Sequence, residues 1–291
     1  MNGIIIVNKP KGCTSHDVVY KIKKIFNEKV GHTGTLDPMA EGVLPILIGK
    51  GTLLSKYLIN HNKKYIVNLQ LGTKTDTADL EGKIIEEQQV NAKLLNKENI
   101  ENILKSFIGK QEQIPPIYSA IKVNGKKLYE YARKGQEVEV KPRKIEIYDI
   151  KLIKYSIQEK TIEFEVYCGK GTYIRSLCED LSKKFETVGY MKNLKRIQVG
   201  DFKIEDSITV ADLEKNINDN QFINNKIISV EKIFEEKNSI ELDEKKLQLF
   251  LNGVKLTQKY PDDIYKIYNK NSSFIGIGII ENQLLKRDIV L

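Results

Sequence analysis

The sequence predicts an α+β fold with a mixed, mainly antiparallel sheet. Residues 63–72 alternate apolar and polar side chains, as a half-buried strand does. Two further strand patterns, 145–155 and 160–168, follow one another with only a short turn between them, which favours antiparallel pairing. Helical periodicity is found in three segments, at 16–27, 96–107 and 173–185. Because these helices do not alternate regularly with strands, a doubly wound parallel sheet is disfavoured.

The length and charge of the chain set broad limits on its class. With 291 residues it can form one or two domains, and no apolar run approaches the roughly 20 residues of a membrane helix. The net charge is +8. Residues 207–291 hold twelve Lys and Arg against thirteen Asp and Glu, so the excess lies in residues 1–206, with 35 against 26. This distribution fits either a polyanionic partner of the N-terminal part or ordinary solvated lysines.

The N-terminal elements precede a loop of unusual composition. The opening "GIIIVNKPKG" reads as a buried strand and a turn, and Ser15 is in a position to cap the helix at 16–27. The segment "GHTGTLDPMAEG", residues 31–42, follows, with its glycines and Pro38 fixing the backbone. The apolar stretch "GVLPILIGKGT" and a short helix near 53–60 lead to the strand at 63–72.

Residues 110–144 read as a basic, tyrosine-bearing insertion. They hold nine Lys and Arg against four acids, and Asn124-Gly125 is a hairpin signal. Basic charge interleaved with aromatic rings suits RNA, which binds through phosphate contacts and stacking. The alternative is a solvated hairpin. After the helix at 173–185 and a returning strand, the neutral C-terminal part ends in an alternating, β-rich segment. The predicted domains are therefore 1–206 and 207–291.

Cysteine and histidine usage argues against disulfides and zinc. The three cysteines, Cys13, Cys168 and Cys178, form no CxxC pair and do not cluster with the three histidines. We therefore expect reduced thiols, no metal site and a cytoplasmic location. The two "GKGT" segments, 49–52 and 169–172, lack the glycine spacing of a phosphate-binding loop and are read as tight turns.

Asp37 is the candidate catalytic carboxylate. An Asp-Pro pair is an ordinary turn signal, but a rigid Gly- and Pro-rich loop is also where functional side chains are held. No second acid stands at fixed spacing, so a paired-carboxylate glycosidase has no support, whereas a lone nucleophilic carboxylate remains open. Such a group needs a cation beside it to stay ionised. Arg175, next to a glycine turn, is of the right type, but composition and spacing do not bring it to Asp37.

Several longer segments together resemble one known family. The segments "VNKPKGCTSHDVV", "GHTGTLDPMAEGVLPILIG", "KKYIVNLQLGTKTDTADLEG", "QIPPIYSAIKVNGKKLYEYARKG" and "GKGTYIRSLCEDL" resemble, in this order, blocks of the bacterial tRNA pseudouridine synthase B (TruB) family. They span about residues 4–200; the tail is only generally similar to the family's small C-terminal RNA-binding domain. The resemblance implies the pseudouridine synthase α+β fold, with 110–144 as a thumb-like insertion and a small, PUA-like, β-rich C-terminal domain.

The resemblance also implies a reaction and a set of site residues. The reaction is the isomerisation of uridine 55 in the T-loop of tRNA, on a flipped-out base and without cofactor or metal. Asp37 matches the nucleophile, Arg175 its ion-pair partner, and Tyr65 a ring that stacks on the base and takes or relays a proton. Three further positions match the substrate pocket: His32, Tyr173 and Leu194. In the thumb, the expected RNA contacts are Lys122, Lys126, Lys127 and Arg133.

Two alternatives stay open beside this expectation. One is a tRNA-binding or folding module without catalysis, which would tolerate loss of Asp37. The other is a pseudouridine synthase acting on another RNA. The first chemical step is also open, since Asp37 could attack uracil C6, attack ribose C1′, or assist loss of the base to a glycal. We expect a monomer that needs no protein partner.

Overall fold

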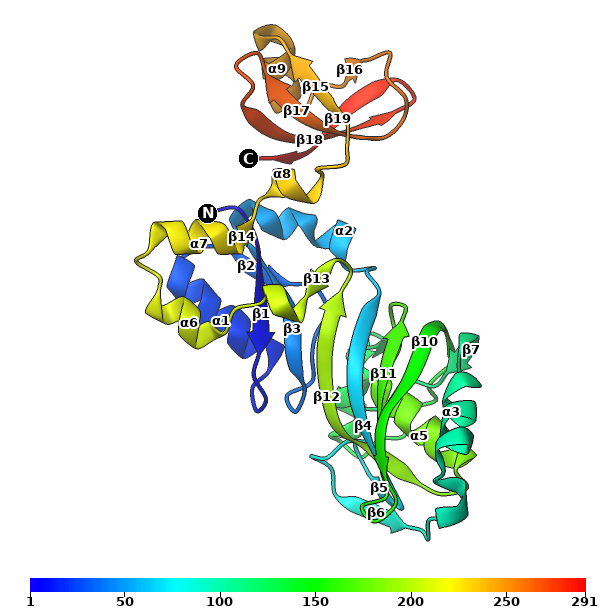
Figure 1. Cartoon of the computed structure of the whole chain (residues 1–291). Helices are drawn as coiled ribbons and strands as arrows, with labels where there is room; N and C mark the ends of the chain where they lie inside the picture. Colours follow the sequence, from blue (N-terminus) through cyan, green and yellow to red (C-terminus); the bar gives the residue numbers. More distant parts are fainter.

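A ten-stranded sheet forms the centre of the N-terminal part (Figure 1). The computed structural model describes all residues, 1–291. Eight strands form the path β14-β1-β3-β12-β4-β11-β10-β7, with β2 added to β3 and β13 to β12. Only the pairing of β12 with β3 is parallel, so the expected mixed, mainly antiparallel sheet is confirmed. The strands are β1 (Gly3–Lys9), β2 (Val30–His32), β3 (Glu41–Ile48), β4 (Lys63–Leu71), β7 (Gly109–Gln113), β10 (Arg143–Ser156), β11 (Thr161–Cys168), β12 (Gly189–Val199), β13 (Phe202–Lys203) and β14 (Ile227–Ile228).

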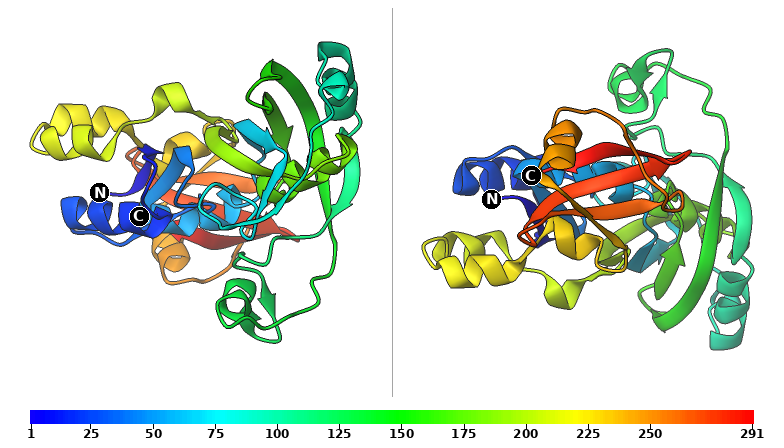
Figure 2. Two further views of the ribbon diagram at one scale, coloured as in Figure 1. Left: turned by 90° about the horizontal axis from the view of Figure 1, so that it is seen from below. Right: turned by 90° about the horizontal axis from the view of Figure 1, so that it is seen from above.

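Helices cover this sheet in two groups (Figures 1 and 2). In the first, α3 (Lys97–Lys105) and α5 (Ile174–Lys184) pack with strands β4, β10 and β12 around one large apolar core. In the second, α1 (Ser15–Phe26), α6 (Val210–Lys215) and α7 (Asn220–Lys226) lie side by side near β1, around another core. The predicted helices at 16–27, 96–107 and 173–185 are thus confirmed to within about two residues.

The start of α1 differs from the prediction in one residue. Thr14, not Ser15, is the N-cap: its hydroxyl accepts a hydrogen bond from the Asp17 amide, and the Asp17 carboxylate accepts one from the Thr14 amide. This reciprocal capping box satisfies two backbone donors that a helix start otherwise leaves free. Ser15 is consequently the first helical residue, and its hydroxyl is free for a contact elsewhere in the molecule.

The thumb stands apart from the sheet on long connecting segments (Figure 2). It consists of the hairpin β8 (Lys122–Val123) and β9 (Lys126–Lys127) followed by α4 (Leu128–Ala132). Asn124 and Gly125 both have positive φ, 49° and 81°, which is the backbone of the expected two-residue turn. The ends of the predicted range belong to β7 and β10, so the part outside the sheet is 114–142.

The predicted boundary at 206–207 stays a prediction, but the chain just beyond it still contacts the N-terminal part. Residues 207–234 pack on the N-terminal part: Ile208, Val210, Leu213 and Ile223 join the core around α1, and β14 pairs with β1. The separate C-terminal sheet begins only at Ser239, with the strand order β15-β17-β18-β19-β16. Short amphipathic helices after residue 206 thus complete an existing core instead of starting a new one.

The C-terminal part is β-rich, as expected, and contacts the N-terminal part through an apolar core. Its elements are β15 (Ser239–Leu242), α9 (Glu244–Leu251), β16 (Leu256–Thr257), β17 (Ile264–Asn269), β18 (Phe274–Glu281) and β19 (Leu284–Val290). Ile277 and Ile289 share a cluster with Ile4 and Val43 of the large sheet. In addition, the Tyr57 hydroxyl donates a 2.6 Å hydrogen bond to Asp288.

The remaining elements are short. They are α2 (Ser55–Leu58), the two-stranded sheet of β5 (Thr73–Thr75) and β6 (Ile84–Glu87), α8 (Val230–Ile233), and three 3₁₀ turns at Gly49–Leu54, Ala92–Leu94 and Ile204–Asp206. None of the helices has both the length and the apolar character needed to cross a bilayer.

Candidate active site

Asp37 lies in the loop between β2 and β3, and the residues on both sides of it are anchored. Ser15 Oγ donates to the carbonyl of Leu36 (3.0 Å) and accepts from its amide (2.8 Å), so one buried hydroxyl holds both backbone groups of Leu36. On the other side, the Pro38 carbonyl accepts from the Gly12 amide at 2.9 Å. The loop is therefore fixed by the chain segment that precedes α1.

Lys9 adds a charged anchor at the same place. Its side chain is fully buried, and its Nζ donates to the carbonyls of Cys13 (2.7 Å), Pro10 (2.9 Å) and Pro38 (3.2 Å). Burial lowers the pKa of Lys9, while the neighbouring Asp37 carboxylate opposes that change. A buried ammonium that donates three hydrogen bonds links the first strand to the Asp37 loop.

Arg175 approaches Asp37 from the start of α5. Its Nε lies 3.0 Å from Asp37 Oδ2, and its Nη2 donates to Asp37 Oδ1 at 3.4 Å. The same guanidinium donates to the carbonyls of Tyr118 (3.0 Å) and Thr77 (3.4 Å) and lies 3.9 Å from Asp79 Oδ2. The arginine is almost completely buried, whereas Asp37 keeps about a third of its side chain exposed, at 34%. The structure thus brings together the two residues that sequence spacing could not.

The groups around Asp37 act on the pKa of its carboxyl group in opposing directions. Burial raises the pKa of Asp37 above the ordinary aspartate range, and the negative charge of Asp79 adds to this effect. The Arg175 and Lys9 charges oppose the shift and favour the carboxylate. A carboxylate that is partly desolvated and held by a guanidinium suits a nucleophile, because desolvation removes water that would otherwise mask its charge.

Asp37 faces a hollow of about 500 Å³ that is also lined by four of the other predicted residues. Tyr65 on β4, Leu194 on β12 and Tyr173 at the start of α5 line it, together with Arg175. Burial raises the pKa of Tyr65 to about 12, so its hydroxyl is protonated in the free protein. Tyr173 is positioned by Gln113, whose side chain accepts from its amide (2.8 Å) and donates to its carbonyl (3.0 Å).

Arg196 is a pocket residue that the sequence did not single out. It is 1% exposed on β12, directly opposite Tyr65 on β4, and it lines the same hollow. Its Nε donates to the Val43 carbonyl (2.8 Å) and its Nη2 to the Gly34 carbonyl (3.1 Å). The sequence pattern of β12 could have indicated this position. Residues two apart on a strand share a face, so Arg196 lies on the same face as Leu194, which was already placed in the pocket.

The other predicted residues lie outside this lining. His32, two residues before Gly34, is half-buried, and its Nδ1 has no hydrogen-bond partner. The thumb residues Lys122, Lys126 and Arg133 are exposed on the hairpin and after α4. Lys127 and Arg133 flank the ring of Tyr129, at 5.4 and 5.3 Å from its centroid, and Tyr129 itself reaches the hollow. The thumb therefore contributes one aromatic ring to the lining of the hollow, with two of its cations beside that ring.

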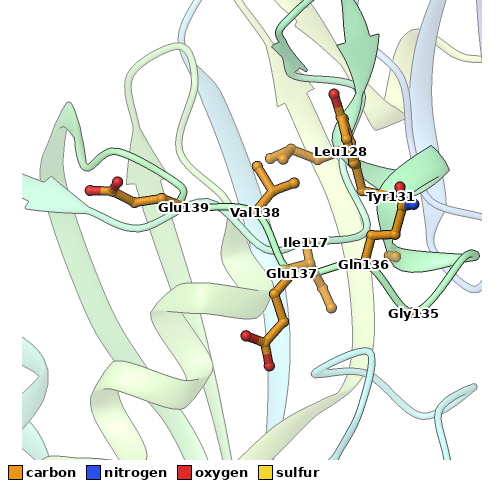
Figure 3. A pocket seen from close by; sticks show the side chains of 9 residues that line it. Ile117, Leu128, Tyr131, Gly135, Gln136, Glu137, Val138 and Glu139 are labelled. Carbon is orange, nitrogen blue, oxygen red and sulfur yellow. The ribbon is translucent and has the colours of Figure 1, made fainter.

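A second hollow lies within the thumb, between α4 and the chain that follows it (Figure 3). Its lining is mainly apolar, with Leu128, Tyr131 and Val138 among the side chains that Figure 3 labels. It is more apolar than the hollow at Asp37 and contains none of the predicted site residues. The chemistry therefore centres on the Asp37 pocket. No group of three or more His, Cys, Asp or Glu side chains is arranged to hold a metal ion.

Comparison with solved structures identifies the class of fold. The chain is similar to a protein in the "Structure of H/ACA RNP bound to a substrate RNA containing 2'-deoxyuridine", with a TM-score of 0.69, 22% identity, and coverage of 99% of this chain and 85% of that one. A chain of a "Cbf5-Nop10-Gar1 Complex" gives a TM-score of 0.68 at 25% identity, with coverage of 99% and 83%. Together with the family match below, the fold is that of the pseudouridine synthases.

Sequence comparison gives the family. The model of the TruB family pseudouridylate synthase N-terminal domain matches residues 23–174, and that of the tRNA pseudouridylate synthase B C-terminal domain matches 175–235. A tRNA pseudouridine synthase B of Caldanaerobacter subterraneus subsp. tengcongensis is 43% identical, over 98% of both chains. One of Clostridium tetani is 46% identical, over 96% of this chain and 95% of the other. The chain belongs to the TruB family of pseudouridylate synthases.

Proposed function

We propose that this protein isomerises uridine 55 in the T-loop of tRNA to pseudouridine, with Asp37 as the nucleophile. The observation that carries the proposal is the Asp37 carboxylate, ion-paired with Arg175 at 3.0 Å and facing a hollow beside Tyr65. Relatives that span nearly the whole chain are named tRNA pseudouridine synthase B, which supports tRNA as the substrate. We further propose a monomeric, cytoplasmic enzyme that requires no cofactor.

The reaction exchanges one bond to the ribose for another. The C1′–N1 bond of uridine breaks with its electron pair passing to uracil, the base turns, and C5 of uracil bonds to C1′. The proton on C5 leaves to a base and N1 gains one, so that substrate and product are isomers. Asp37 attacks C1′, adds to C6, or removes the C2′ proton to give a glycal; its position beside Arg175 is compatible with each route.

A stacked T-loop uridine must be flipped out before it can reach Asp37. Tyr65 and Leu194 then provide the apolar faces between which a base can lie. Because its phenol is protonated at neutral pH, Tyr65 acts first as a stacking ring. It then handles the C5 proton as a relay, in which the phenol passes its own proton towards N1 as it receives the one that leaves C5. Tyr129 and the thumb cations would hold the RNA strand at the pocket mouth.

The test uses unmodified tRNA transcript, the wild-type chain and its Asp37→Asn variant, without added cofactor. Pseudouridine is mapped by carbodiimide labelling and primer extension, and tRNA affinity is measured by filter binding. We expect a stop one nucleotide 3′ of uridine 55 with the wild type only, and affinities of the two proteins within about threefold of each other.

Other outcomes would redirect the proposal. A stop at a different uridine would keep the enzyme class and change the site. Tight tRNA binding with no stop at all would favour a binding module. A tenfold loss of affinity in Asp37→Asn would contradict the separation of the catalytic from the binding role.

A further inference from the structure

Arg196 is a fully buried cation without an acidic partner. No Asp or Glu oxygen lies within the 4.0 Å of an ion pair, and its two hydrogen bonds go to the neutral carbonyls of Val43 and Gly34. Among the neighbouring side chains, the Tyr65 phenol and, from beyond ion-pair distance, the Asp37 carboxylate favour its charged form. A buried charge is costly unless it is paired, so an arginine with no carboxylate at ion-pair distance in the lining of this hollow indicates that further negative charge arrives there from outside the protein.

The position of Arg196 within the pocket restricts what that negative charge can be. Arg196 is 1% exposed on the inner strand β12, opposite Tyr65 and on the same face as Leu194. The RNA backbone has to continue away from the site, so its phosphates stay near the mouth of the hollow. Under the proposed function, the flipped base is the part of the RNA that enters between Tyr65 and Leu194. The uracil ring is therefore the group that we expect to meet Arg196.

We propose that Arg196 is a catalytic residue that contacts uracil and stabilises the negative charge that the base carries when its bond to ribose breaks. The inference rests on the proposed function but not on the route. In each of the three routes the electron pair of the C1′–N1 bond passes to the base and spreads over N1 and its carbonyl oxygens. A fixed guanidinium in a site that excludes water is an effective partner for charge that develops only during the reaction.

The role differs from that of Arg175. Arg175 is already paired with a carboxylate in the free protein, so its charge is largely compensated before substrate binds. Arg196 has no carboxylate at ion-pair distance. Burial lowers its pKa, and the Tyr65 phenol beside it and the more distant Asp37 carboxylate oppose that shift. The two arginines thus have different roles. Arg175 positions the nucleophile, and Arg196 stabilises the negative charge on the base when its bond to ribose breaks.

The experiment compares two substrates, two variants of Arg196 and one control variant. Wild type, Arg196→Gln and Arg196→Lys are assayed under single-turnover conditions on tRNA transcripts that contain either uridine or 5-fluorouridine. Fluorine withdraws electrons and makes the departing base a better-stabilised anion. Lys195→Gln is the matched control, because it removes a cation from the same strand on the opposite face. Disappearance of the original nucleoside is followed by chromatography of digested RNA, and affinity by filter binding.

We expect Arg196→Gln to slow the reaction of uridine by about 100-fold or more, in line with loss of one preorganised charge-stabilising group. The loss of rate should be several-fold smaller with 5-fluorouridine, because the anion of the fluorinated base depends less on stabilisation by the protein. Arg196→Lys should show the same trend with smaller losses, and it supplies the comparison if Arg196→Gln does not fold. Affinity for both RNAs should change by less than threefold.

Three results would overturn the proposal. Equal deficits on the two substrates would mean that Arg196 only supports the loop through Gly34 and Val43. Weakened binding that accounts for the whole loss would mean that it contacts a phosphate. A wild type that converts no uridine would overturn the proposed function as well, whereas the first two results leave that function intact.

Discussion

Arg175 and Asp37 form an ion pair of 3.0 Å although 138 positions separate them in the chain. The same guanidinium also donates to the carbonyls of Thr77 and Tyr118. It therefore joins the Asp37 loop, the loop after β5 and the base of the thumb. One buried side chain thus links the carboxylate to the base of the thumb, in addition to the Ser15 and Lys9 contacts that hold the Asp37 loop.

Replacing Arg175 should therefore affect both activity and stability. In Arg175→Met, the half-buried Asp37 and the buried Asp79 lose the cation between them, so we expect the free energy of unfolding to fall by about 3 kcal/mol. Turnover should fall to background, because the nucleophile is no longer oriented. Urea unfolding and single-turnover assays measure the two effects. Arg143→Met, an exposed arginine at the start of β10, is the control, and equal effects of the two variants would contradict this role.

The pH dependence of the reaction should report the state of Asp37. The reactive form is the carboxylate, so activity is present above the pKa of Asp37 and is lost as the pH falls through it. Because burial and the Asp79 charge raise that pKa, the acid limb should lie above the ordinary aspartate value of about 3.9. Asp79→Asn removes one of these causes and should move the limb to lower pH. A single-turnover pH profile measures both, with circular dichroism to check folding; an unmoved limb would refute the coupling.

Ser15 should act as a positioning residue for Asp37. Its hydroxyl holds the amide and the carbonyl of Leu36, so Ser15→Ala leaves two buried backbone groups without a partner. We expect a loss of about 1–3 kcal/mol in unfolding free energy and a lower kcat at an unchanged KM. Ser106→Ala is the control, because that exposed serine bonds only within its own helix end. A rise in KM alone would argue against positioning.

Substitutions of Tyr65 separate stacking from proton transfer. Tyr65→Phe keeps the ring and removes the hydroxyl, while Tyr65→Leu removes both. If the hydroxyl takes the proton, both variants should lose activity and Tyr65→Leu should also bind tRNA more weakly, by about 1–3 kcal/mol for a lost stacked base. Single-turnover assays and filter binding distinguish the two roles. A fully active Tyr65→Phe would limit this residue to stacking.

The thumb cations should contribute to tRNA affinity through phosphates. Neutralising Lys126, Lys127 and Arg133 should weaken binding. The slope of the logarithm of the binding constant against the logarithm of the salt concentration should become less steep by about 0.7–0.9 for each lost phosphate contact. Titrations at several salt concentrations measure the slope. The matched control neutralises Lys93, Lys97 and Lys105, three exposed lysines around α3. An unchanged slope in the thumb variant, or the same change in both, would refute the contact.

The fold class and most elements could be predicted from the sequence, because they depend on local patterns. Alternation specified β4, helical periodicity specified α3 and α5, and Asn124-Gly125 specified the thumb hairpin. The domain boundary could not be placed in this way. Whether the helices after residue 206 start a new core or complete an old one depends on β1 and α1, which lie about 200 positions earlier.

The site was predicted in part. Asp37, Tyr65, Tyr173, Arg175 and Leu194 lie around one hollow, and their roles stay predictions. Ser15 was read as a helix cap, but Thr14 takes that position and leaves the Ser15 hydroxyl to hold Leu36. Arg196 was missed because an arginine on a strand next to Lys195 looks like a surface charge. Only its place between β3 and β4 makes it buried.

The sequence by itself indicated candidate residues for the chemistry and determined most of the local structures that present them. A Gly- and Pro-rich loop around Asp37, a basic thumb and the order of strands and helices are all properties of short segments. Tertiary structure alone decided which charges meet. An ion pair, a buried hydroxyl or an unpaired arginine depends on separations of a few ångströms between segments far apart in the chain, and local sequence places no limit on those distances.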